Sequence, residues 1–208
     1  MVALRREHPI RVAIDGPDAA GKTTLARELA MSIEVTGRRV IRASVDGFHR
    51  PRRERLARYG DSAEAFYRDS FDYELLRSQL LSPLGPEGSR KYRVAVFDHR
   101  SDEPSLAPEL MAACRDILLV DGIFLLRPEL VRYWEYRVFV KVDWRETVDR
   151  AVRRDPPLFG SAEKVRRRYE DKYIPGQKLY FAEARPESIA DALVTNDDPE
   201  LPSCVFRE

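Results

Sequence analysis

Cysteine, lysine and long apolar segments are scarce in this chain of 208 residues. Its two cysteines, Cys114 and Cys204, lie far apart without the spacing of a zinc site, so we expect a reduced, cytoplasmic setting. No apolar run approaches the roughly 20 residues of a membrane span, and the first residues lack the apolar core of a signal peptide. The formal net charge of +1 gives no support for a nucleic-acid or membrane partner.

Lysine supplies only six of the 36 basic side chains, and arginine supplies the rest. Arginine suits phosphate binding, but so many arginines must mostly cover the surface. We therefore assign a role to an arginine only where its position supports one. Among the few lysines, Lys22 stands in a recognisable motif.

The segment Gly16–Thr23 reads G-x-x-x-x-G-K-T, the pattern of a phosphate-binding loop. Residues 12–14 before it predict a buried strand, and the apolar spacing over residues 25–30 predicts a helix after it, which is the context this motif requires. We expect Lys22 to reach the β- and γ-phosphates of ATP and the Thr23 hydroxyl to bind Mg²⁺. The residues expected to hold ATP phosphates are Gly16, Asp18, Ala19, Ala20, Gly21, Lys22, Thr23 and Thr24.

The remaining pattern predicts one α/β domain. Strands are expected at 40–45, 93–97, 116–120, 136–142 and 192–195. Helices are expected at 22–35, 71–81, 144–154 and 162–173, and a further helix is expected after Pro108. Ser161 is the expected N-cap of the helix at 162–173.

Three of these strands end on a carboxylate, namely Asp46, Asp98 and Asp121. The carboxyl ends of parallel strands open onto the ligand crevice, so we expect all three near the phosphate loop. Asp121 follows an apolar strand and is expected to hold Mg²⁺, although an Asp-Gly pair is also a common turn signal. Asp46 could bind Mg²⁺ or accept the proton of an attacking hydroxyl.

The chain resembles the uridine kinase and phosphoribulokinase-like family through the order of its motifs. These are the phosphate loop and the segments starting at Asp46 (Asp-Gly-Phe-His), Ser70 (Ser-Phe-Asp-Tyr), Phe97 (Phe-Asp-His-Arg) and Asp121 (Asp-Gly-Ile). The resemblance implies a P-loop fold like that of nucleoside monophosphate kinases, with three α/β/α layers, five parallel strands in the order 2-3-1-4-5 and a small lid. It implies a single domain over 1–208, an acceptor-binding insertion over about 47–92 and a lid over about 150–175. The implied reaction is Mg²⁺- and ATP-dependent phosphorylation of a hydroxyl on a small metabolite.

The resemblance also assigns roles residue by residue. It makes Asp46 the catalytic base, with Lys22, Arg150 and Arg153 as catalytic partners, and it places Arg154 on the nucleotide. The implied acceptor contacts are Asp46, Phe48, Asp72, Phe97, Asp98, His99 and Asp102, and the implied Mg²⁺ ligands are Thr23, Asp46 and Asp121. Glu146 and Asp149 precede Arg150 and Arg153 by four residues, so surface ion pairs are an alternative for these arginines.

Two positions depart from uridine kinases, where an aromatic residue and a histidine read the uracil. His99 and Asp102 stand there instead, so we expect uridine to be a poor acceptor. Pantothenate or nicotinamide riboside kinase-like activity is the nearest alternative. A P-loop NTPase or a nucleotide-binding regulatory protein without an acceptor remains a different class. The sequence leaves homo-oligomer formation open.

Overall fold

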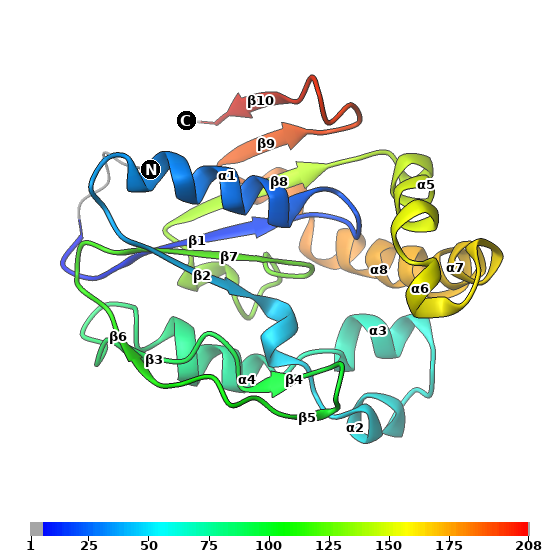
Figure 1. Ribbon diagram of the computed structural model, residues 1–208, viewed down its shortest axis with the longest axis horizontal. Helices are drawn as coiled ribbons and strands as arrows, with labels where there is room; N and C mark the ends of the chain where they lie inside the picture. The colour runs from blue at the N-terminus through cyan, green and yellow to red at the C-terminus, as the bar shows by residue number, and fades with distance from the viewer. Residues whose placement is uncertain (1–5, 208) are drawn as a thin grey trace.

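A six-stranded sheet forms the centre of the computed structural model, which describes residues 6–207 (Figure 1). Five strands run parallel, and the last strand of the chain is antiparallel to its neighbour. From edge to edge the sheet contains β10 (Ser203–Phe206), β9 (Ala192–Thr195), β8 (Tyr136–Lys141), β1 (Ile10–Asp15), β7 (Ile117–Gly122) and β2 (Val40–Ser44). Numbered along the chain, the parallel strands lie in the order 2-3-1-4-5. The predicted α/β fold with a mostly parallel sheet is confirmed, and β10 is an addition to it.

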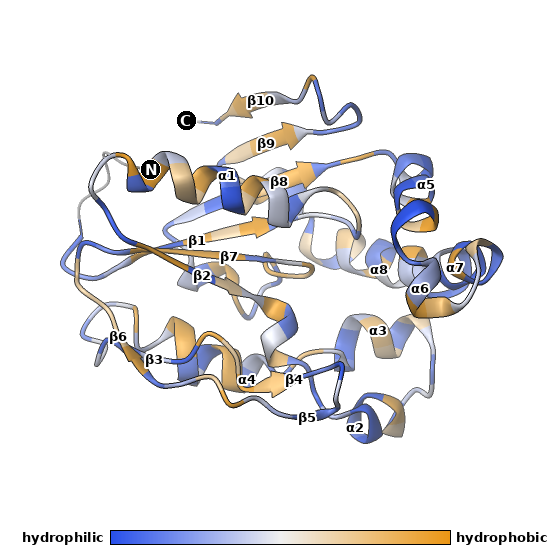
Figure 2. Ribbon diagram, viewed as in Figure 1, coloured by the Kyte–Doolittle hydropathy of each residue, from blue (hydrophilic) through white to orange (hydrophobic). Residues whose placement is uncertain are grey.

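Helices cover both faces of the sheet, because its central strands are apolar on both sides (Figure 2). On one face, Val12 and Ile14 of β1 pack with Ala26 and Ala30 of α1 (Lys22–Glu34). On the other face, the intervening Ala13 belongs to a larger core cluster. That cluster includes side chains of α3 (Ala63–Asp69), α4 (Tyr73–Leu76), the π-helical turn η2 (Arg77–Leu81) and α8 (Ile174–Ala184). The chain therefore forms three layers.

The segment between β2 and β7 differs most from the sequence prediction. It begins with η1 (Val45–Phe48) and α2 (Arg52–Ala57). After α3, α4 and η2 it forms two small hairpin-like pairs, β3 (Lys91–Tyr92) with β6 (Leu110–Met111) and β4 (Phe97–Asp98) with β5 (Glu103–Pro104). The predicted sheet strand at 93–97 is wrong, as is the predicted helix after Pro108. Val94 and Val96 pack against the core, and the Val96 N–H donates to the Gly47 carbonyl oxygen at 2.8 Å beside the sheet.

Short helices project from one end of the sheet after β8 (Figure 1). They are α5 (Trp144–Arg154), α6 (Pro156–Phe159), α7 (Ala162–Arg168) and the π-helical turn η4 (Tyr169–Tyr173). Val148 and Ala151 of α5 pack with Val165 and Tyr169 in a separate small core. Ser161 Oγ accepts a hydrogen bond from the Lys164 N–H at 3.2 Å, so the predicted N-cap is confirmed. These elements include most of the residues predicted to form a lid, about 150–175, and that role stays a prediction.

The last connections are η3 (Val131–Tyr133) before β8 and α9 (Pro186–Ile189) before β9. In both cases a short turn returns the chain to the start of a parallel strand. Within residues 6–207, no helix is both long and apolar enough to cross a bilayer.

Candidate active site

The glycine-rich loop joins β1 to α1, and its glycines lie where a side chain does not fit. A Cβ at Gly16 would lie 2.3 Å from the carbonyl oxygen of Val140, and φ is +151° there. Gly21 occupies the N-cap of α1 with φ of 90°. The loop therefore brings backbone N–H groups and the positive end of α1 together, which is an arrangement that binds anions.

Lys22 is almost fully buried within this loop, with 9% of its surface exposed. Its Nζ donates to the Pro17 carbonyl oxygen at 2.5 Å. Burial lowers the pKa of Lys22, although the carboxylates of Asp18 and Asp15 act in the opposite direction. A buried ammonium is stabilised by an anion beside it, so the loop is electrostatically suited to phosphate.

Thr23 and Asp121 lie together at the first turn of α1 and the end of β7. Thr23 Oγ1 donates to Asp121 Oδ2 at 2.6 Å, and Ser44 of β2 is the register partner of Asp121. Among residues 6–207, no three His, Cys, Asp or Glu side chains converge on a possible metal site. Mg²⁺ often takes only one or two protein oxygens and completes its shell with water and phosphate. The hydroxyl and carboxylate present here fit such an ion.

Asp46 lies in η1, directly after β2, and its side chain is 59% exposed. The Nε2 atom of His49 is 3.6 Å from Asp46 Oδ1, and His49 Nδ1 lies 2.9 Å from the Ser70 carbonyl oxygen. Desolvation alone would raise the pKa of Asp46, but His49, His99 and Lys22 together lower it below its usual value. Asp46 is therefore held as a carboxylate that can accept a proton or bind a cation.

A groove of about 600 Å³ runs past these residues, and we call it the Asp46 groove. It contains all three predicted Mg²⁺ ligands and four of the seven predicted acceptor residues. Its polar and aromatic lining consists of Thr23, Arg42, Ser44, Asp46, Phe97, Asp98, His99, Arg100, Ser105 and Asp121. Asp98 reaches the groove from the β4–β5 pair rather than from the predicted sheet strand.

Three expected acceptor residues do not line this groove. Phe48 is fully buried in the core. Asp72 Oδ1 accepts from the Leu75 N–H at 2.9 Å and so caps α4. Asp102 Oδ1 accepts from the Arg52 N–H at 2.8 Å and lies 3.8 Å from Arg55 Nη2. Their proposed contacts with an acceptor stay predictions.

Each arginine of α5 that the sequence assigned to phosphate already has a partner. Arg150 Nη2 donates to the carbonyl oxygens of Asn196 at 2.7 Å and Asp197 at 2.9 Å. Arg153 Nε donates to the Asp149 carbonyl oxygen at 3.1 Å. Arg154 forms a two-pronged ion pair with the neighbouring Asp155. The expected i,i+4 pairs with Glu146 and Asp149 are absent from the ion pairs of residues 6–207, and phosphate contact stays a prediction.

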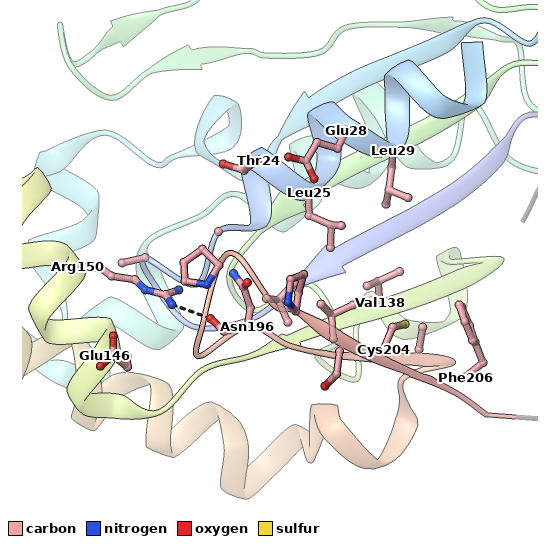
Figure 3. Close-up of a pocket in the computed structure, with 18 of the residues that line it drawn as sticks. Thr24, Leu25, Glu28, Leu29, Val138, Glu146, Arg150, Asn196, Cys204 and Phe206 are labelled. Carbon is pink, nitrogen blue, oxygen red and sulfur yellow. Dashed lines mark hydrogen bonds between the residues drawn. The ribbon is translucent and has the colours of Figure 1, made fainter. Parts of the chain in front are cut away.

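A second, larger cavity of about 770 Å³ lies on the α1 side of the sheet, and we call it the α1 cavity (Figure 3). It starts at Gly21 and Thr24 beside the phosphate loop and is mostly apolar beyond them. Figure 3 shows Leu25 and Leu29 of α1 facing it from one side, with Val138, Cys204 and Phe206 on the other. Sequence analysis missed this cavity because β9, β10 and α1 are far apart in the chain.

Asn196 closes the polar end of the α1 cavity. Its Nδ2 donates to the Ala20 carbonyl oxygen at 2.8 Å, which connects the segment after β9 to the phosphate loop. In Figure 3 the Arg150 guanidinium points toward the Asn196 backbone. In the sequence, the one feature that pointed to this role of Asn196 was its place as a polar residue directly after the last predicted strand.

Asp15 and Tyr180 form a buried pair behind the phosphate loop that the sequence also did not reveal. The Tyr180 hydroxyl donates to Asp15 Oδ2, and the N–H groups of Gly16 and Leu126 donate to the same carboxylate at 2.7 and 3.0 Å. Burial raises the pKa of Asp15 to about 6. One turn earlier on α8, Gln177 Oε1 accepts from the Asp18 N–H at 2.9 Å. Helix α8 is thus fixed to the end of β1 and to the first half of the loop.

Comparison with known proteins agrees with this arrangement. A uridine kinase from Leuconostoc citreum (strain KM20) is 25% identical over 136 residues, which is 65% of this chain and 63% of that enzyme. The match thus spans less than two thirds of the relative. The structure of a possible uridine kinase from Bacillus stearothermophilus superposes with a TM-score of 0.70 at 21% identity, covering 92% of this chain and 91% of that one.

A second solved structure, D-glycerate 3-kinase from Cryptococcus neoformans var. grubii, has a TM-score of 0.70 at 13% identity, covering 99% and 93% of the two chains. No protein-family model matches the chain. The structural likenesses establish the fold, and the sequence match supports the resemblance to uridine kinase-like P-loop kinases.

Proposed function

We propose that this chain is an ATP- and Mg²⁺-dependent kinase that phosphorylates a hydroxyl of a small metabolite. The observation that carries the proposal is the Thr23–Asp121 hydrogen bond of 2.6 Å, formed beside Lys22 at the end of a groove that also contains Asp46. A phosphate loop alone would suit any NTPase. A second carboxylate facing an open groove beside that loop supplies what transfer to a bound hydroxyl needs.

In the proposed step, the acceptor oxygen bonds to the γ-phosphorus while the bond from that phosphorus to the β,γ-bridging oxygen breaks. Asp46 accepts the proton of the attacking hydroxyl, and ADP takes the electron pair of the broken bond. Lys22 and the loop N–H groups neutralise charge on the phosphates. Catalysis then comes mainly from positioning and charge, with no covalent enzyme intermediate.

Thr23 and Asp121 would hold Mg²⁺, with Asp46 as the further candidate ligand. The ion supplies charge neutralisation to the phosphate oxygens of the nucleotide. Because Thr23 and Asp121 are already hydrogen-bonded to each other, little rearrangement is needed to direct both oxygens at one ion.

The base of ATP is proposed to enter the α1 cavity, which starts at Gly21 and Thr24. Leu25 offers an apolar surface there, and Asn196 offers its side-chain amide at the entrance. Mostly apolar cavities with a few fixed polar groups are typical of nucleotide and small-ligand sites. Arg150 would then lie between base and phosphates.

The test is a steady-state assay of ADP formation with and without a panel of hydroxyl metabolites. ADP formation that depends on an acceptor, with one phosphorylated product per ADP, is expected. Turnover without any acceptor would instead support an NTPase, and ATP binding without turnover would support a regulatory nucleotide-binding protein. Pantothenate, nicotinamide riboside and uridine belong in the panel. We expect uridine to react poorly because Asp102 is engaged by Arg52 and Arg55.

A further inference from the structure

The Asp46 groove continues away from the phosphate loop between two walls. One wall is β2, where Arg42 and Ser44 both line the groove. Side chains two positions apart on a strand share a face and lie about 7 Å from each other. The other wall is the segment around β4, which contributes Phe97, His99 and Arg100. Arg42 and Arg100 therefore line one groove from two separate segments of the chain.

The carboxylates of the groove already have donors. Asp121 accepts from Thr23, and Asp46 faces His49. Asp98 is directed into its own turn, where Oδ1 accepts from the Arg100 N–H at 2.9 Å. Each of these carboxylates therefore already has a hydrogen-bond donor or a histidine as its neighbour.

The guanidinium groups differ from the carboxylates in this respect. Within residues 6–207, neither Arg42 nor Arg100 has a side-chain hydrogen bond or a carboxylate within 4 Å. Arginines nearby in the chain do have such partners, as in Arg39 with Asp116 and Arg55 with Asp102. Both arginines are exposed, and an anion bound in the groove would supply the partner that these two guanidinium groups lack.

We propose that the acceptor is itself an anion, a small hydroxyl compound with a carboxylate or phosphate group, which Arg42 and Arg100 bind while its hydroxyl lies at Asp46. This inference rests on the proposed kinase function. The planar guanidinium matches carboxylate and phosphate oxygens through two parallel hydrogen bonds. The hydroxyls of Ser44 and Ser105, which also line the groove, can donate to the same oxygens.

A neutral nucleoside fits this groove less well. Its base needs fixed donors and acceptors, and Asp102 is held by α2 outside the groove. A polar group of the base that is buried without a partner would weaken the binding of the nucleoside. A small anion needs only the two guanidiniums and a hydroxyl-sized space next to Asp46.

The experiment uses two series of acceptors that differ in charge. The first consists of glycerol, glycerate and glycerol 3-phosphate, and the second of ribose, ribonate and ribose 5-phosphate. Uridine is the neutral nucleoside. ADP formation is measured at one ionic strength for the wild type, Arg42→Gln, Arg100→Gln and the control Arg145→Gln. Arg145 is an exposed arginine on α5 outside the groove. Glycerate and ribonate test for a site that binds a carboxylate. Glycerol 3-phosphate and ribose 5-phosphate test for a site that binds a phosphate.

We expect either the carboxylates or the phosphate esters to exceed the neutral compound of the same series at least tenfold in kcat/KM. A charged hydrogen bond contributes about 1.5–3 kcal/mol, so each groove variant should raise the acceptor KM by roughly 10- to 150-fold. The KM for ATP and the kcat should stay near wild type, and Arg145→Gln should change neither constant.

Two results would overturn the inference in different ways. If neutral acceptors react as well as their anionic partners and both groove variants behave like Arg145→Gln, the arginines are only a solvated surface, and the kinase function stands. If no acceptor of either charge raises ADP formation above the acceptor-free rate, the kinase function fails and this inference fails with it.

Discussion

Thr23 and Asp121 are 98 positions apart in the sequence, yet Thr23 Oγ1 donates to Asp121 Oδ2 at 2.6 Å. Thr23 lies in the first turn of α1, and Asp121 lies near the end of β7, the strand beside β1. The hydrogen bond therefore fixes the relative position of two elements that must both face the nucleotide. It also gives the proposed Mg²⁺ site a preformed pair of oxygen ligands.

Thr23→Val is expected to raise the Mg²⁺ concentration needed for half-maximal ADP formation, because valine has the shape of threonine without its hydroxyl. Loss of one ligand and one hydrogen bond should shift that concentration by about tenfold or more, corresponding to about 1.4 kcal/mol. Thr23→Ser keeps the hydroxyl and is the matched control. An unchanged Mg²⁺ requirement in Thr23→Val would remove Thr23 from the metal site.

Lys22→Ala is expected to abolish phosphoryl transfer in a protein that still folds. The buried ammonium is the charge nearest to the proposed phosphates, and loss of one preorganised donor typically costs on the order of 10²–10³ in rate. The assay is ADP formation with saturating acceptor, alongside circular dichroism to verify folding. Near-normal turnover in a folded Lys22→Ala protein would contradict the phosphate-loop assignment.

Asp46→Asn should leave ATP binding nearly intact and remove most of the chemical step, since asparagine cannot accept the hydroxyl proton. Loss of a general base typically costs about 10²–10⁴ in kcat. Asp121→Asn is the comparison, and it should act mainly on the Mg²⁺ requirement. Calorimetric ATP binding and single-turnover rates separate the two effects. If both variants only shift Mg²⁺ dependence at an unchanged maximal rate, Asp46 is a metal ligand and not the base.

The sequence predicted those parts of the site that depend on local signals. The phosphate loop, the strand before it, the helix after it and the positions of Asp46 and Asp121 follow from short-range patterns, and the structure places them as expected. The strand at 93–97 failed because an apolar run cannot distinguish a sheet strand from a segment packed on the core. Asp72 illustrates the same limit, since aspartate is equally suited to a ligand contact and to the N-cap it forms.

Features that depend on distant partners had no signal in the sequence. The engagement of Asp102 requires Arg52 and Arg55 on α2. The α1 cavity requires β9 and β10 to return beside α1. The Asp15–Tyr180 pair links positions 165 residues apart. None of these can be read from periodicity, because each is set by tertiary packing.

Tyr180→Phe is expected to destabilise the protein more at pH 8 than at pH 5. The pKa of Asp15 is raised to about 6 by burial, and the hydrogen bond from Tyr180 counters part of that rise by favouring the ionised carboxylate. Without the hydroxyl the folded-state pKa rises further, while the unfolded value stays near 3.9. At pH 5 the carboxyl of both folded proteins is largely protonated, so the variant loses a neutral hydrogen bond to Asp15, about 0.5–1.5 kcal/mol. At both pH values it also loses the hydrogen bond that Tyr180 accepts from the Leu126 N–H at 3.1 Å.

Above pH 6 the wild-type carboxylate is ionised and the variant loses a charge-assisted hydrogen bond, about 1.5–3 kcal/mol. The folded state then binds more protons in the variant than in the wild type, so the difference in unfolding free energy grows as pH rises through 6. Urea denaturation at the two pH values measures that difference. Tyr59→Phe is the control, because the Tyr59 hydroxyl makes no hydrogen bond within residues 6–207 and its ring stacks on Arg58. Equal losses for Tyr180→Phe at pH 5 and pH 8 would mean that Asp15 does not ionise in this range.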